Sequence, residues 1–82
     1  MSEAEGSREE ARRVLQAAAV EAHGRPDAFV LRHRVMQRSG IVDPEDFRAV
    51  AEHLEGKGWI AEADEDYAIF VVTTAGIDEA SD

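Results

Sequence analysis

The sequence of 82 residues has no cysteine, and this absence excludes both a disulfide framework and a thiolate metal site. No apolar run approaches the ~20 residues that are needed to cross a bilayer. Residues 1–5 carry two acids and no base, whereas a signal peptide begins with positive charge. These absences predict a cytoplasmic protein that has no membrane partner.

Basic residues are also scarce, since nine Lys and Arg stand against eighteen Asp and Glu and give a formal net charge of −9. Hydrophobic residues make up 44% and charged residues 33%, as in ordinary globular domains, and the length fits a single core. A negative charge disfavours general binding to nucleic acid, because contacts with phosphates need cations. We therefore expect one folded domain, for which DNA is a possible but electrostatically disfavoured partner.

The charges are segregated along the chain. Residues 28–42 contain three Arg and no acid, whereas residues 59–82 contain seven acids and no base. The basic stretch fits either a solvated helix face or a patch that docks an acidic partner or a phosphate. The preference for Arg over Lys fits a GC-rich genome, or adaptation to high salt, in which carboxylates keep the surface hydrated.

The first long segment is predicted to be a helix that follows a flexible tail at residues 1–6. Ser7 and Glu10 have the spacing of a capping box, in which each side chain binds the other residue's backbone amide. Gly24 can end the helix in the left-handed conformation, and Pro26 prevents its continuation. Between these signals apolar residues recur at helical spacing: Ala11, Val14, Leu15, Ala18, Ala19 and Ala22.

The middle of the chain contains two further helical patterns. Residues 29–31 fit either a short strand or the first turn of a helix, because a short apolar run has no decisive period. The helix that follows ends at residues 39–40. Asp43 and Pro44 then mark the start of a third helix, because Asp caps a first turn and Pro is favoured at its first position.

The last third of the chain has the composition of strands. Residues 59–63 and 67–73 are rich in apolar, β-branched and aromatic residues, and the acidic segment 64–66 between them is predicted to be the turn of a hairpin. Residues 74–77 are expected to break the second strand and make a short final turn. A flexible acidic tail is predicted at residues 78–82.

Two segments carry a resemblance to a known family: Leu-Glu-Gly-Lys-Gly-Trp-Ile at residues 54–60 and Val-Val-Thr-Thr-Ala-Gly-Ile at residues 71–77. With an acidic turn between them, they look like the end of the third helix, the wing and the exit strand of winged helix-turn-helix domains. The chain resembles this superfamily over roughly residues 8–77. The resemblance implies an α+β fold, a small winged-helix-like domain with three helices packed on a two- or three-stranded antiparallel sheet and a C-terminal hairpin as the wing.

The domain is expected to span residues 7–77, between the two flexible tails. Trp59 and Phe70 are assigned to the core rather than to a binding surface, because a domain this small needs its aromatic residues for burial. The other expected core residues are Val14, Leu15, Ala18, Leu31, Val35, Phe47, Val50, Leu54, Ile60, Ile69 and Val71.

Winged helices serve both as transcription regulators and as protein-interaction modules. In the DNA-binding members the third helix enters the major groove and the wing offers Arg or Lys to the phosphates. Here the exposed face of the third helix is expected to be mainly acidic, and the wing turn is Asp64-Glu65-Asp66. The favoured hypothesis is a non-enzymatic module that binds a protein partner or a second copy as a homodimer; the alternative is a DNA-binding transcriptional regulator. The candidate contact residues are Arg32, Arg34, Arg38, Arg48, His53 and Lys57.

Catalytic, cofactor and metal sites are not expected. The sequence has neither a nucleophile elbow nor a Gly-rich phosphate loop. His23 and His53 lack the spacing of paired helical metal ligands, and the acidic turn lacks the remainder of an EF-hand loop. A ligand pocket of ~300 Å³ would also hollow out much of so small a core. We therefore expect a protein that is not an enzyme.

Overall fold

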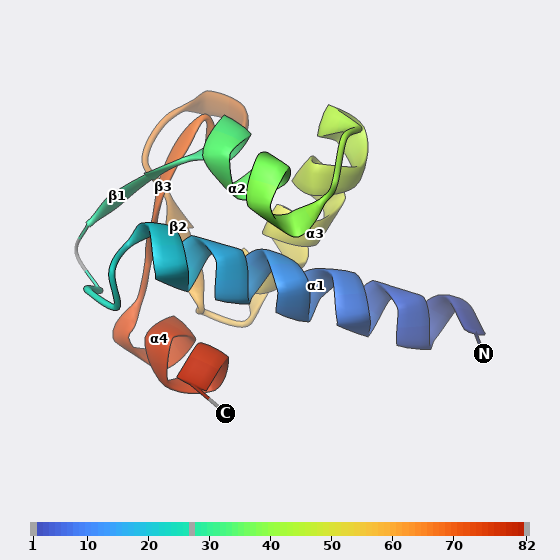
Figure 1. The fold of residues 1–82 in the computed structure, drawn as a ribbon, viewed down its shortest axis with the longest axis horizontal. Helices are drawn as coiled ribbons and strands as arrows, with labels where there is room; N and C mark the ends of the chain where they lie inside the picture. The colour runs from blue at the N-terminus through green and yellow to red at the C-terminus, as the bar shows by residue number, and fades with distance from the viewer. Residues whose placement is uncertain (1, 27, 82) are drawn as a thin grey trace.

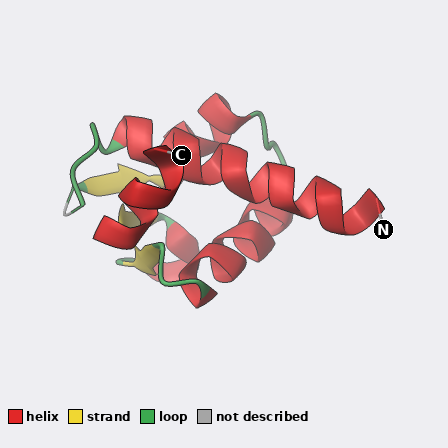
Figure 2. Ribbon diagram, turned by 90° about the horizontal axis from the view of Figure 1, so that it is seen from below, coloured by secondary structure: helices red, strands yellow, loops and turns green. Residues whose placement is uncertain are grey.

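Helix α1 (Ser2–Glu21) is the longest element and lies across the others (Figure 1). The structure, a computed structural model, describes residues 2–26 and 28–81, with side chains from residue 8 onward. The first turns of α1 extend beyond the other elements, as the view from below also shows (Figure 2). After α1 the chain forms β1 (Phe29–Leu31), α2 (Arg32–Ser39), α3 (Pro44–Gly56), β2 (Ile60–Glu62), the 3-10 helix η1 (Glu65–Tyr67), β3 (Ile69–Val72) and α4 (Thr74–Ser81).

The start of α1 was predicted wrongly. The helix begins at Ser2, so residues 2–6 of the predicted tail are helical and Ser7, the expected cap, lies inside the helix. Residues 3–5, Glu-Ala-Glu, are of types that form helices readily. Local propensity therefore continues the helix beyond the capping box.

Other local signals predicted helix ends correctly. Gly24 adopts a φ of 71°, and its N–H donates to the carbonyl of Ala19 at 3.0 Å, which closes the end of α1. At the start of α3, the Asp43 carboxylate accepts from the N–H of Glu45 at 2.9 Å, and Pro44 occupies the first helical position. These ends depend on a few neighbouring residues, so the sequence determines them.

Residues 29–31 form a strand, which decides between the two alternatives for this segment. Strand β1 pairs antiparallel with β3, and β3 pairs antiparallel with β2, so the strand order is β1-β3-β2. The predicted C-terminal hairpin is confirmed as β2 and β3, with Ile60 opposite Val72. Strands β1 and β2 are the two edges of this sheet.

The core residues of β1 and β3 were predicted correctly only at Phe70. Three residues expected in the core are instead partly or largely exposed: Leu31, Ile69 and Val71. Their neighbours in the chain are at most 1% exposed: Val30, Phe70 and Val72. Because consecutive side chains of a strand point to opposite faces, a shift of one residue inverts the assignment.

The predicted core is confirmed for the helices and for the first residue of β2. Eight expected core residues are at most 9% exposed: Val14, Leu15, Ala18, Val35, Phe47, Val50, Leu54 and Ile60. Phe70 also lies in the core, where its ring packs against Phe47 with centroids 6.1 Å apart. Trp59 is only partly buried and packs at the margin of the core.

The chain after β3 forms helix α4 rather than the predicted short turn and tail. Residues 78–81 of the predicted tail are helical, and Asp82 lies outside the described residues. Thr73 caps the helix, since its hydroxyl accepts from the N–H of Gly76 at 3.0 Å and donates to the carbonyl of Gly58 at 2.6 Å. The cap therefore joins α4 to the turn that follows α3.

The fold is α+β, with helices packed on a three-stranded antiparallel sheet, as predicted. The order α1, β1, α2, α3, β2 and β3 is the order that the resemblance implies, and α4 adds a fourth helix to the three expected. The hairpin returns its turn toward α3, where the Tyr67 hydroxyl donates to the Glu55 carboxylate. The acidic turn therefore lies beside an acidic helix.

Candidate functional site

The six predicted contact residues divide between two surfaces. Arg32, Arg34 and Arg38 lie on α2. Arg48 lies on α3, and His53 and Lys57 lie at the C-terminal end of α3. All of these side chains are exposed except Arg32, which is partly buried. Only the last two line the groove that is described below.

Two of the arginines contact the acidic turn. The Arg32 guanidinium donates to the backbone carbonyl of Asp66 at 3.1 Å, and Arg48 lies 3.6 Å from the Asp66 carboxylate. Arg48 also pairs with Glu52, one turn further along α3, at 3.3 Å. Arg48 is therefore partly neutralised by acids of the same chain, and Arg32 is already bound to a backbone carbonyl, which leaves less of this surface available to an external phosphate.

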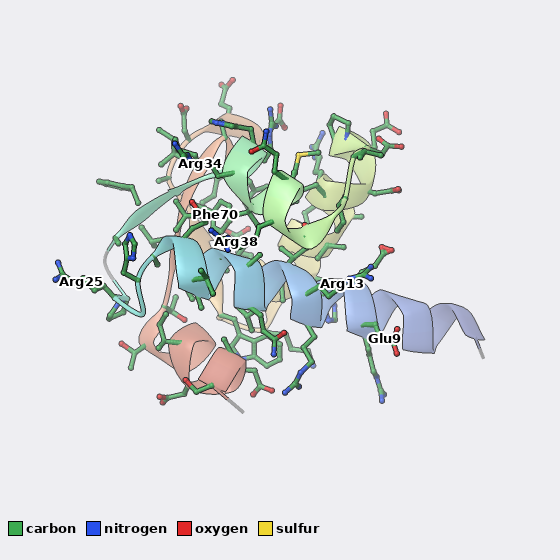
Figure 3. All side chains as sticks on the ribbon, in the orientation of Figure 1. Glu9, Arg13, Arg25, Arg34, Arg38 and Phe70 are labelled. Carbon is green, nitrogen blue, oxygen red and sulfur yellow. The ribbon has the colours of Figure 1, made fainter. Side chains whose placement is uncertain are left out.

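A third arginine has a structural role. Arg38 contacts one carboxylate oxygen of Glu21 through Nε at 2.9 Å and through Nη2 at 2.8 Å, which links the end of α2 to the end of α1. The Glu21 side chain is only 16% exposed, so this pair is better shielded from solvent than the pairs of Arg48. Arg34, on the first turns of α2, makes no ion pair with the described side chains (Figure 3).

The acidic surface predicted for the third helix is present. All seven residues of α3 that were expected to be exposed are exposed: Glu45, Asp46, Arg48, Ala49, Glu52, His53 and Glu55. The turn residues 64–66 are exposed as well. On a winged helix this is the surface that would face DNA, so the acids there repel phosphates where DNA recognition requires attraction.

The hairpin turn is fastened to α3 by a tyrosine that the sequence analysis did not single out. The Tyr67 hydroxyl donates to Glu55 Oε1 at 2.6 Å, and the N–H of Glu62 donates to Glu55 Oε2 at 3.2 Å. These two bonds favour the charged carboxylate and hold the pKa of Glu55 below its usual value. Burial, followed by the bond to Glu55, raises the pKa of Tyr67. The arrangement stabilises the turn.

The substitution Tyr67→Phe is expected to lower the free energy of unfolding by about 1–2 kcal/mol, because it removes a hydrogen bond to a charged group. It should also move the pKa of Glu55 back toward the ordinary glutamate value, since the bond from Tyr67 is the larger cause of the shift. Chemical denaturation measures the first effect, and a carboxylate-detected NMR titration measures the second. An unchanged Glu55 pKa would contradict the bond.

The same pair predicts how stability changes with pH. The contribution of Glu55 is present above the ordinary glutamate pKa and is lost as the pH falls through the lowered folded value. The contribution of Tyr67 is present below the ordinary tyrosine pKa of about 10 and is lost as the pH rises above it. The chain has one tyrosine, so tyrosinate absorbance follows this group alone. A folded protein in which Tyr67 ionises near its ordinary pKa would contradict the prediction.

The outer face of the sheet is apolar and open to solvent at one edge. Phe29 is 72% exposed and Leu31 is 40% exposed, and they lie opposite Val71 and Ile69 of β3. Ala61 of β2 lies on the other side of Val71 and extends this row across the sheet. In the part of the chain that the structure describes, β1 pairs with β3 alone, so its second side is free. Exposed apolar faces of this kind are typical of interaction surfaces.

A groove of about 520 Å³ lies between α1, the end of α3 and α4. Its lining includes charged, imidazole and apolar side chains: Arg8, Arg12, Lys57, His53, Leu15 and Trp59. His53 and Lys57 were predicted contact residues, whereas no sequence signal joined them to the arginines of α1. A pocket of this size was expected to hollow out much of the core. The groove does not, because it lies between elements at the surface.

Among the described residues, no group of three or more His, Asp and Glu side chains is placed to hold a metal ion. None of the helices in residues 2–26 and 28–81 combines the length and the apolar character needed to cross a membrane. Comparisons of the chain with protein-family models, with curated proteins and with solved structures find no match.

Proposed function

We propose that this chain is a non-enzymatic interaction module of winged helix-turn-helix architecture, which binds an acidic, extended segment of another protein along β1. The observation that carries the proposal is the apolar edge of the sheet, where Phe29 is 72% exposed. A large aromatic side chain left in water forgoes about 1.5–3 kcal/mol of burial free energy, which a partner can recover. The free side of β1 supplies backbone groups that an added strand can pair with.

The charges around β1 support an acidic partner. Residues 28–42 contain no acid, and Arg34, in the first turn of α2 after β1, makes no ion pair with the described side chains. A second copy bound at the same edge would add a second basic stretch rather than an acid with which Arg34 can pair. A segment that combines apolar residues with acids satisfies both the apolar face and the cations.

The alternative of a DNA-binding regulator is less well supported. It needs cations on α3 and on the hairpin turn, and those surfaces carry acids. Arg32 and Arg48 already contact Asp66, and Arg38 contacts Glu21. Among the predicted contact arginines, only Arg34 is exposed and makes no ion pair with the described side chains.

Selection from a displayed library of short random peptides tests the proposal directly. The enriched peptides are expected to combine acids with apolar residues. Phe29→Ser should weaken their binding about thirtyfold, which corresponds to about 2 kcal/mol for an aromatic anchor. Val42→Ser is the matched control, because Val42 is 88% exposed but lies in the loop between α2 and α3. Peptides that bind the two variants equally well would refute the β1 site.

Titration with a DNA duplex at two salt concentrations distinguishes the proposed protein-binding module from a DNA-binding regulator. We expect no binding at low micromolar protein concentration. Binding that weakens steeply as salt rises, and that Arg34→Ala reduces, would replace the proposal by the DNA-binding function. Light scattering of the free protein completes the test, since a dimer that Phe29→Ser dissociates would make a second copy the partner.

A further inference from the structure

The groove between α1, the end of α3 and α4 has the dimensions of a small-molecule site. Its volume of about 520 Å³ lies within the range of about 300–1,000 Å³ that is usual for small-ligand pockets. One wall is apolar and comes from the core, because Leu15 is 2% exposed and Ala11 is 6% exposed. Trp59 adds a partly buried aromatic ring to this wall.

Trp59 is held in place by its backbone. Its N–H donates to the carbonyl of Leu54 at 3.1 Å, and its carbonyl accepts from the N–H of Thr73 at 2.9 Å. The residue is therefore fixed between the end of α3 and the start of α4. A ring on a fixed backbone loses little conformational freedom when a ligand packs against it.

Apart from His53, the rest of the lining is charged, and its Arg and Lys residues exceed its acids by one. Arg8 and Arg12 lie one turn apart on α1, and Lys57 faces the same groove from the end of α3. Glu9 and Glu79 are the acids that line it. None of these five groups pairs with another described side chain, so the cations are available to a ligand. Arginine binds a carboxylate through two parallel hydrogen bonds.

From the apolar wall and the single excess cation, we infer that this groove binds a small organic monoanion, a carboxylate attached to an apolar body. The apolar body packs against Trp59 and Leu15, and the carboxylate is bound by Arg12 and Lys57. A ligand with several acids would exceed the charge that the lining offers, which favours a single carboxylate. This site is separate from the β1 edge, since Phe29 does not line the groove.

The test uses phenylbutyrate as the probe and its uncharged amide as the matched ligand. The chain has one tryptophan, so intrinsic tryptophan fluorescence reports on the groove itself. We expect a saturable change with a dissociation constant of about 1 mM or tighter. The amide should bind about tenfold more weakly, because it cannot form the charged contacts. The NMR signal of the Trp59 indole N–H provides a second measurement of the same binding.

Variants locate the charged contacts. Lys57→Gln and Arg12→Gln should each weaken binding of phenylbutyrate about fivefold. Arg34→Gln is the control, because it removes an equally exposed cation outside the groove. All three side chains are exposed, so the variants are expected to fold, and circular dichroism checks this.

Three results would overturn the inference. The first is equal binding of the acid and the amide, which would leave only an apolar contact. The second is an equal loss of affinity in Lys57→Gln and Arg34→Gln, which would reduce the charge effect to a general one. The third is no saturable change in either signal at concentrations up to about 10 mM. None of these results bears on the β1 edge, and Phe29→Ser should leave the affinity for phenylbutyrate unchanged.

Discussion

Replacement of Gly76 by alanine is expected to destabilise the protein by about 3 kcal/mol, although it adds a single methyl group. A Cβ at this position would overlap the backbone carbonyl oxygen of Trp59 and would lie only 2.8 Å from Val72 Cγ1. A backbone carbonyl cannot rotate away as a flexible side chain can, so α4 has to move. That movement strains the cap in which Thr73 accepts from the N–H of Gly76. Chemical denaturation followed by circular dichroism measures the loss.

Gly56→Ala is the matched control for this prediction. It adds the same methyl group at the last residue of α3, where a Cβ would have nothing within 4 Å. Alanine is expected to stabilise the protein there by about 0.5–1 kcal/mol, because it restricts the unfolded chain and favours the helix. The opposite signs of the two variants isolate the contact with Trp59. If Gly76→Ala were as stable as the unmodified protein, α4 would not be packed against Trp59 as the structure has it.

Gly76 also illustrates what the sequence can and cannot predict. From the sequence, this glycine was predicted to break the second strand. The strand does end before it, but Gly76 lies inside helix α4. Its small size is required by a carbonyl group seventeen positions earlier in the chain. A contact of that kind leaves no local pattern. Asp43 and Pro44, in contrast, act on adjacent residues, and the start of α3 was predicted correctly.

The error in the sheet has a related cause. Residues 69–72, Ile-Phe-Val-Val, are all apolar, so they show no alternation that would tell the inner face from the outer one. The fold decides, because β3 is the central strand and its register with β1 places Phe70 against Val30 on the helix side. Central strands are commonly apolar on both faces. Their composition therefore predicts a strand but does not predict which residues are buried.

Some features of the candidate surfaces could be predicted from the sequence, and others could not. The acids of α3 were recognised because a helix with Phe47, Val50 and Leu54 buried must expose the positions between them. The contacts of Arg32 and Arg48 with Asp66 were not, because they depend on how the hairpin turn folds back on α2 and α3. The groove at Trp59 brings together three helices that are distant in the sequence. The spacing of residues along the sequence does not show which distant helices pack together.

The second large effect is expected at Phe70. Phe70→Ala should destabilise the protein by about 3–5 kcal/mol, because it removes a fully buried ring and leaves a cavity beside Phe47. A small domain has a total stability of about 5–15 kcal/mol, so this variant is expected to lose a large share of it. The measurement is the midpoint of chemical denaturation. Where the variant has no folded baseline, Phe70→Leu provides a smaller loss that can be measured.

Phe29→Ala makes the same chemical change on the other face of the sheet, only one strand away. Phe29 is 72% exposed, so the loss is expected to stay within about 0.5 kcal/mol. The comparison therefore tests which face of the sheet lies in the core. Comparable losses from both variants would mean that the outer face is covered in the free protein, and the β1 edge would then not be open to a partner. A large difference would leave Phe29 as a residue that the fold does not need, which is the property expected of a binding residue.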